Sequence, residues 1–126
     1  SAEKIITIGE AELEVMKVIW KSKEAISTTE IGKAVAKHGW KRTTITTFLA
    51  RLAQKGAISA EKRGKTMYYT PIITAKQYKK TQVKNLLKNV FDGSAQELVV
   101  SLFEEKTLSD NDIAELKAIF DRSDEL

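Results

Sequence analysis

Hydroxyl and cationic side chains gather between residues 41 and 51 of the sequence. Four of the five residues at positions 43–47 are threonines, which helix propensity alone does not favour. Threonine hydroxyls bond phosphate oxygens, threonine methyls contact the thymine methyl, and arginine binds guanine with two hydrogen bonds. A solvated helix face would explain any one of these residues, but the cluster indicates contact with DNA. The candidates are Lys41, Arg42, Thr43, Thr44, Thr46, Thr47 and Arg51, with Arg42 as the base reader.

A second basic cluster, Lys62-Arg63-Gly64-Lys65, lies between two segments that favour β-strands, 57–61 and 66–70. Gly64 allows a tight turn, so the three cations sit at the tip of a predicted hairpin. There they are placed to bond phosphates or to reach toward a minor groove, although a solvated turn would also account for them. Tyr68 and Tyr69 alternate, so one is expected to face the core and the other the hairpin surface.

Three predicted helices position the first cluster. Apolar residues recur with three-and-four spacing in segments 10–21, 28–37 and 41–55, which is typical of helices with one buried face. Gly39 and Gly56 stand where the second and third helices end. Three helices followed by a two-stranded wing is the order of a winged helix-turn-helix, whose third helix enters the major groove. The predicted reading head extends from Thr28 to Tyr69, and Thr28 joins the candidate DNA contacts.

Apolar residues recur at helical spacing again after Pro71. The predicted helices cover 76–91 and two shorter segments, and Ser109 is the predicted cap of the last one. The predicted fold is therefore mainly α, with a winged-helix domain at residues 1–71 and a helical dimerisation domain at 72–126. A short chain gains stability from a core shared between two copies. We place the dimer interface on Leu86, Leu87, Val90, Leu98, Leu102, Phe103, Leu116 and Phe120, with the alternative that half of these pack within one subunit.

Charge is divided unevenly along the chain. Residues 1–90 hold 18 Lys and Arg against 7 Asp and Glu, whereas residues 91–126 hold 3 against 10. A basic front and an acidic tail are typical of a polyanion-binding head joined to a partner-contacting segment. One histidine and no cysteine argue against an enzyme, a metal site or a cofactor. Without disulfides or a long apolar run, we expect a cytoplasmic protein that does not insert into membranes.

Several segments resemble the BlaI/MecI family of penicillinase and methicillin-resistance repressors. The matching residues are Ala11–Met16 with Ile19-Trp20, then Trp40, Thr44-Ile45, Arg51-Leu52, Lys55-Gly56, Tyr68-Tyr69, Leu108-Ser109 and Ile113–Leu116. The resemblance implies a homodimer that binds a palindromic operator with TACA/TGTA-type half-sites and represses antibiotic-resistance genes. It places Thr44, Thr47 and Arg51 at family contacts with DNA. Thr43 and Thr46 stand where relatives carry basic residues.

The resemblance also implies a mode of derepression. Relatives are cut in the dimerisation domain after a membrane-bound β-lactam sensor is triggered, so a protease or a sensor-transducer is an implied partner. The cut bond aligns with Ser101-Leu102 here, where relatives have Asn-Phe. Loss of the dimer would remove the linked second head and its contribution to operator affinity. Relatives in the copper-responsive branch use a cysteine-rich tail, which this chain lacks.

Two other functions remain open at the level of sequence. A winged helix can dock on a protein through its wing, in which case DNA binding would be weak and insensitive to salt. A ligand-gated regulator of the MarR kind would need an apolar pocket between the head and the dimerisation helices.

Overall fold

The computed structural model describes residues 6–123, and the chain divides into two compact units. The first, Ser1–Thr81, is called the head below, and the second, Gln82–Leu126, is called the tail unit. The division falls inside a helix that begins in the head, beyond Pro71. The domain boundary at Pro71 remains a prediction, because compactness alone does not define a domain that folds independently.

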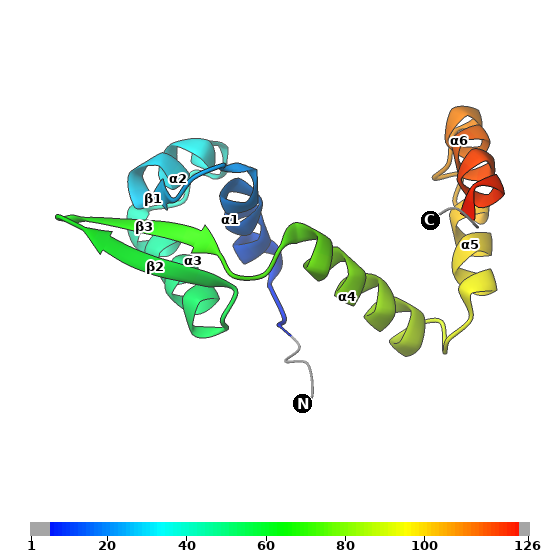
Figure 1. Ribbon diagram of the computed structural model, residues 1–126, viewed down its shortest axis with the longest axis horizontal. Helices are drawn as coiled ribbons and strands as arrows, with labels where there is room; N and C mark the ends of the chain where they lie inside the picture. Colours follow the sequence, from blue (N-terminus) through cyan, green and yellow to red (C-terminus); the bar gives the residue numbers. More distant parts are fainter. Residues whose placement is uncertain (1–5, 124–126) are drawn as a thin grey trace. The chain divides into compact units, whose positions relative to one another are not determined.

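The head contains helices and a small sheet, coloured blue to green in Figure 1. In order these are α1 (Glu10–Lys21), β1 (Ile26–Ser27), α2 (Thr28–Ala34), the 3-10 helix η1 (Ala36–His38), α3 (Arg42–Gln54), β2 (Ile58–Arg63), β3 (Thr66–Pro71) and the start of α4 (Ala75–Asn89). The strand order is β1-β3-β2, all antiparallel. This confirms the predicted winged helix, in which β2 and β3 form the wing.

One apolar core holds the three helices against the sheet. Its buried residues are Val15, Met16 and Ile19 of α1, Ile31 and Val35 at α2, Ile45, Leu49 and Leu52 of α3, and Ile58 and Tyr69 of the wing. The helix positions recur at three-and-four spacing, which is the pattern that predicted the helices. Burial of this face leaves the opposite face of α3 in solvent.

Local signals set the ends of these elements. Ser27 caps α2 by accepting a hydrogen bond from the Glu30 N–H at 3.2 Å. Gly39 and Gly56 adopt left-handed φ values of 67° and 83° after η1 and α3, as their positions predicted. The α-helical part of the second helix is shorter than predicted, because the chain tightens into η1 after Ala34.

The wing is a longer hairpin than the sequence indicated. Arg63 pairs with Thr66, so the turn is Gly64-Lys65 alone, and Lys62 and Arg63 belong to β2. Tyr69 is buried and its neighbour Tyr68 lies on the other face, as the alternation predicted. Strand β1, which was not predicted, pairs Ile26 with Tyr69 and so joins the base of the wing to α2.

The tail unit contains the end of α4 together with α5 (Ala95–Glu104) and α6 (Asp110–Asp121). Ser94 caps α5, and Ser109 forms a reciprocal capping box with Asp112, which confirms Ser109 as a cap. None of its described residues is buried. No helix in the described part of the chain is long and apolar enough to cross a membrane.

Candidate nucleic-acid interface

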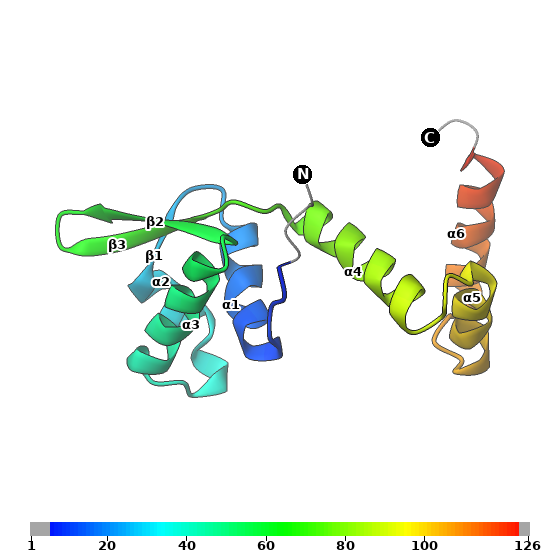
Figure 2. The same ribbon diagram turned by 90° about the horizontal axis from the view of Figure 1, so that it is seen from below.

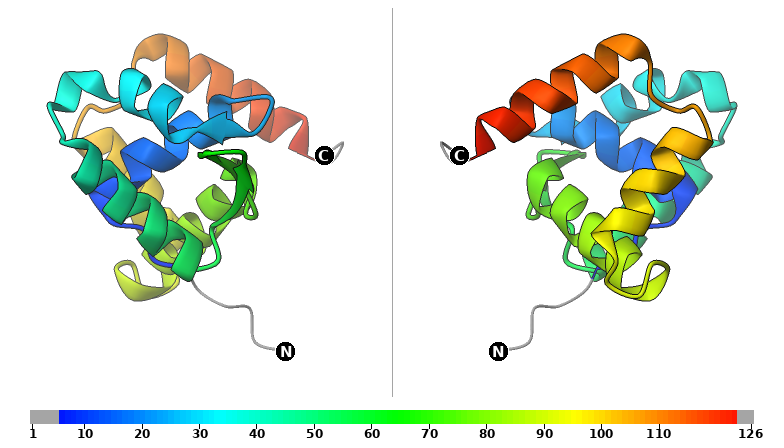
Figure 3. Two further views of the ribbon diagram at one scale, coloured as in Figure 1. Left: turned by 90° about the vertical axis from the view of Figure 1, so that its left-hand side faces the viewer. Right: turned by 90° about the vertical axis from the view of Figure 1, so that its right-hand side faces the viewer.

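Helix α3 presents one continuous polar stripe. Residues that recur at three-and-four spacing along it are all exposed, namely Thr43, Thr46, Thr47, Ala50, Arg51 and Gln54. We call this stripe the reading face. Figure 2 shows α3 beside the wing, and the left panel of Figure 3 shows the head facing the viewer. Sequence reasoning missed Ala50 and Gln54, although their spacing from Thr43 and Thr47 was a usable signal. Thr44 is half-buried beside this face.

The threonine hydroxyls of the reading face are already engaged within the helix. The Oγ1 atoms of Thr46 and Thr47 each donate a hydrogen bond to the Thr43 carbonyl at 2.9 Å. Because the hydroxyl protons are used, these side chains offer lone pairs and methyl groups to a ligand. The methyl groups are of the type that can contact a thymine methyl in the major groove.

The start of α3 is cationic and lacks a side-chain cap. Its N-cap residue is Lys41, its first residue is Arg42, and its first turn contains no acid. Free N–H groups and the helix dipole at such an end favour a phosphate oxygen. Arg42 donates a hydrogen bond to the Thr29 hydroxyl at 3.4 Å, which joins α3 to the start of α2.

Thr28, which was predicted to contact DNA, is buried at the start of α2. It is only 5% exposed, whereas its neighbour Thr29 is exposed and contacts Arg42. Both residues border a hollow of about 330 Å³ between α2 and α3. The sequence could not separate them, because each is a hydroxyl residue at the same helix start. Thr29 replaces Thr28 as the more accessible candidate.

The wing presents three cationic side chains to solvent. Lys62, Arg63 and Lys65 are all exposed. The Arg63 guanidinium lies 4.8 Å from the ring centroid of Tyr68, and Arg63 donates a hydrogen bond to Glu61 Oε2 at 3.1 Å. These contacts hold Arg63 on one face of the wing. Of the expected DNA contacts, all except Thr28 are exposed or half-buried on the head.

An ion pair beneath the reading face ties α3 to α1. Lys55, at the end of α3, bonds the buried carboxylate of Glu12, which also accepts from the Gly9 N–H. Burial opposes the negative charge, but the bonds from Lys55 and Gly9, with the positive charges of Lys55 and Arg51, outweigh it. The pKa of Glu12 is therefore lowered. Both Glu12 and Lys55 belong to segments that carry the family resemblance.

The predicted dimer-interface residues lie at the surface of the tail unit. Leu86, Val90, Phe103 and Phe120 are exposed, whereas Leu87, Leu98, Leu102 and Leu116 are half-buried. Exposed apolar residues that sequence reasoning missed are Val83, Val99, Val100 and Ile119. Exposed apolar residues in this number are typical of a surface that contacts a partner.

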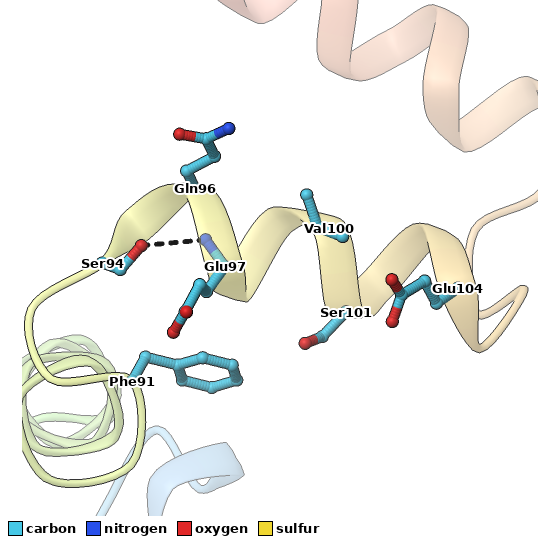
Figure 4. Close-up of a pocket in the computed structure, with 7 residues that line it drawn as sticks. All are labelled: Phe91, Ser94, Gln96, Glu97, Val100, Ser101 and Glu104. Atoms are coloured by element: carbon cyan, nitrogen blue, oxygen red, sulfur yellow. Dashed lines mark hydrogen bonds between the residues drawn. The ribbon is translucent and has the colours of Figure 1, made fainter.

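The predicted cleavage bond, Ser101-Leu102, lies within α5. Ser101 is half-buried, and its carbonyl accepts a hydrogen bond from the Glu105 N–H at 3.2 Å. Its side chain borders a hollow of about 530 Å³ together with Phe91, Glu97 and Glu104 (Figure 4). The bond is therefore helical in this structure.

No group of three or more histidine or acidic side chains in the described part of the chain is arranged to hold a metal ion. The geometry of the head instead combines an exposed polar stripe on α3, a cationic helix start and a cationic wing. This arrangement defines the class of winged-helix DNA-binding proteins.

Comparison with known proteins identifies the family within that class. The sequence profile described as "Penicillinase repressor" matches residues 8–122, and the chain belongs to this family. It is 38% identical to the penicillinase repressor of Bacillus licheniformis over 120 residues, covering 94% of this chain and 93% of that one. It is 32% identical over 119 residues to the methicillin resistance regulatory protein MecI of Mammaliicoccus sciuri, covering 94% and 97%.

A solved structure of a relative matches the head. It is the Bacillus licheniformis BlaI monomeric form in complex with the blaP half-operator. The sequence identity is 46%, the TM-score is 0.51, and the match covers 60% of this chain and 94% of that one.

Proposed function

We propose that this chain is a transcriptional repressor that binds a palindromic operator as a homodimer, at genes for resistance to β-lactam antibiotics. The observation that carries the proposal is the reading face of α3 flanked by two cationic surfaces. The half-operator complex of the BlaI relative supports it, because that protein has the same head at 46% identity. Since its target is DNA, we place the protein in the cytoplasm, and it needs no catalytic group.

Each part of the head has a distinct role in this proposal. Arg51, Gln54 and the methyl groups of Thr46 and Thr47 meet base edges in the major groove. Lys41, Arg42 and Thr29 bind the backbone at the start of α3, with Thr43 and Thr44 beside them. Arg51 thus replaces Arg42 as the proposed base reader, because Arg42 lies at the first residue of the helix and bonds Thr29. Lys62, Arg63 and Lys65 of the wing contact phosphates farther along the duplex.

A homodimer is proposed because the tail unit cannot bury its apolar residues alone. Val90, Phe103 and Phe120 are 65%, 49% and 68% exposed. A second copy of the same surface would cover them, and a two-fold axis would present two heads to two inverted half-sites. Linking the heads raises the effective concentration of the second and so strengthens operator binding.

Derepression is proposed to follow cleavage at Ser101-Leu102. A protease requires an extended backbone, so the end of α5 must unwind and give up the hydrogen bond at the Ser101 carbonyl. The product would keep the head but lose α6 and part of the dimer surface. Its operator affinity would then fall toward that of a single head. A sensor-transducer in the membrane is the proposed source of the signal.

The proposal is tested by a salt titration of binding. The full chain is titrated against a duplex with two inverted TGTA half-sites and against a scrambled duplex, and the oligomeric state is measured on the same sample. We expect a dimer that prefers the palindrome by about a thousandfold or more, with log affinity falling steeply against log salt concentration. Equal, weak and salt-insensitive binding to both duplexes would instead support a protein partner for the wing.

A further inference from the structure

A second site lies on the head, away from the reading face. It is a hollow of about 460 Å³ between α1 and the first turns of α4. Its apolar lining comes from Leu13 and Trp20 of α1 and from Ala75 and Tyr78 of α4. No residue of the proposed DNA contacts borders it, so DNA binding does not account for it.

The floor of this hollow is held in place by bonds of its own. The Trp20 indole N–H donates to the Ile73 carbonyl at 2.9 Å, and the Trp20 and Tyr78 ring centroids are 5.7 Å apart with the planes inclined at 40°. Thr74 and Gln77 exchange hydrogen bonds of 2.8 and 3.0 Å that fix the start of α4. The aromatic surface is therefore organised before any ligand arrives, which lowers the entropic cost of binding.

The rim of the hollow is positively charged. Lys17, Lys21 and Lys79 line it, and all three are exposed. Within residues 6–123, no carboxylate forms an ion pair with any of them. An apolar floor under three lysines is complementary to a molecule with an apolar body and a negative charge.

We propose that this hollow binds a small organic carboxylate with an aromatic ring. Sites for small molecules commonly have volumes of about 300–1,000 Å³, apolar walls and a few polar groups that fix orientation. The ring would lie against Trp20 and Tyr78, and the carboxylate would meet the lysines. An inorganic anion lacks the apolar body, and a neutral aromatic molecule would leave the lysines unused.

The position of the site implies a regulatory role, which rests on the proposed function. Two of its walls, Ala75 and Tyr78, belong to α4, the helix that continues into the tail unit. A ligand that binds between α1 and α4 changes how firmly α4 is held on the head. If the dimer binds its operator with α4 held in one particular position on the head, the ligand changes the operator affinity, and the operator changes the ligand affinity by the same factor.

The site is tested by calorimetric titration of the full chain with 2-naphthylacetate. Its neutral amide, 2-naphthylacetamide, has the same ring and nearly the same shape. We expect one site per chain and binding of the acid about fivefold tighter than the amide, because only the acid attracts the lysines. Equal binding of acid and amide, or no binding up to the solubility limit, would overturn the proposal.

Two pairs of variants locate the binding. Ala75→Leu fills the hollow and should abolish binding, whereas Ala118→Leu on the exposed surface of α6 should not change it. Lys79→Gln leaves the fold intact and should weaken binding about threefold. Lys84→Gln, on the same helix but outside the hollow, should have no effect. Unchanged binding in both Ala75→Leu and Lys79→Gln would place the ligand elsewhere and refute the site.

The regulatory step has a separate readout. Saturating 2-naphthylacetate should change operator affinity of the wild-type chain at least about fivefold, since allosteric coupling energies usually reach this size. The Ala75→Leu chain should show no change. Ligand binding without any shift in operator affinity would refute the regulatory role. The proposed function is tested independently, by operator binding of the ligand-free chain.

Discussion

At the scale of single residues, Arg51 is the side chain of the reading face that is best placed to make a base-specific contact. It is exposed, it follows Thr47 by one helical turn, and it contributes positive charge to the environment of Glu12. A guanidinium in this position can bond two acceptors of one guanine. Its loss therefore removes a specific contact and not only a charge.

We expect Arg51→Ala to weaken operator binding by about 1–3 kcal/mol and to leave the dimer intact. Binding to a scrambled duplex should weaken less, because only the operator offers the specific base. Fluorescence anisotropy with both duplexes measures the difference, and Lys23→Ala, in the exposed loop after α1, is the control. An operator affinity equal to that of the wild type would remove Arg51 from the site.

Glu61 is an acid within the cationic wing, so we expect it to weaken DNA binding where Arg51 strengthens it. Its carboxylate accepts a hydrogen bond from Arg63 and adds a negative charge near the expected phosphate path. Glu61→Gln should raise affinity for operator and scrambled duplexes alike, by about 0.5–1 kcal/mol at low salt. Glu115→Gln, in the tail unit, tests for a general effect of charge. A loss of affinity in Glu61→Gln would mean that the acid positions Arg63 productively.

At the scale of elements, the buried carboxylate of Glu12 adds an ion pair with Lys55 to the apolar packing between α1 and the end of α3. Its pKa is lowered in the folded state, so the ionised form is favoured by folding. This stabilisation is fully present above the unfolded pKa, near 4.5, and is lost as the pH falls through the lower folded value. The pair thus contributes to acid sensitivity of the head.

Glu12→Gln should lower the free energy of unfolding of the head at pH 7 by about 1–3 kcal/mol. It should also reduce the further fall in this free energy as the pH is lowered, because the titrating carboxylate is gone. Urea unfolding followed by tryptophan fluorescence isolates this effect, since Trp20 and Trp40 both belong to the head. Glu14→Gln, on the same helix, is the matched control. A Glu12→Gln chain that kept the wild-type slope of stability between pH 3 and pH 5 would contradict the assignment.

The elements of the head were largely predictable because their signals are local. Helices with buried stripes, left-handed glycines at Gly39 and Gly56, and the alternation of Tyr68 and Tyr69 follow from the spacing of residue types. Strand β1 was not predictable, because two residues carry no periodicity and Ile26 pairs with Tyr69 far along the chain. Bonds between distant residues, such as Trp20 to Ile73, and the burial of Thr28 instead of Thr29, arise only from tertiary packing.

At the scale of the whole molecule, charge is divided between the two units, although α4 carries basic residues into the tail unit. The head, residues 1–81, holds 16 Lys and Arg against 7 Asp and Glu, whereas residues 82–126 hold 5 against 10. A negative tail unit is repelled by DNA, so it disfavours nonspecific contact away from the head. In the proposed dimer, specific affinity comes from two heads acting together, so the proposal depends on the apolar surface of the tail unit.

Phe120 provides the sharpest test of that dependence. Because it is 68% exposed in the single chain, Phe120→Asp costs little within one subunit, and any large effect must come from a partner. We expect the dimer dissociation constant to rise about a hundredfold or more, since an apolar contact is lost and a charge is buried. Lys117→Gln, on the same helix and also exposed, makes the same change of one unit in net charge and is the control.

Operator binding separates this effect from damage to the head. Phe120→Asp should bind a single half-site as the wild type does, while its affinity for the full palindrome falls to nearly the same value. Sedimentation velocity on the same samples reports the loss of dimer. If Phe120→Asp remained a dimer with wild-type affinity for the palindrome, the partner surface would exclude the end of α6, and Val90 and Phe103 would be the next positions to change.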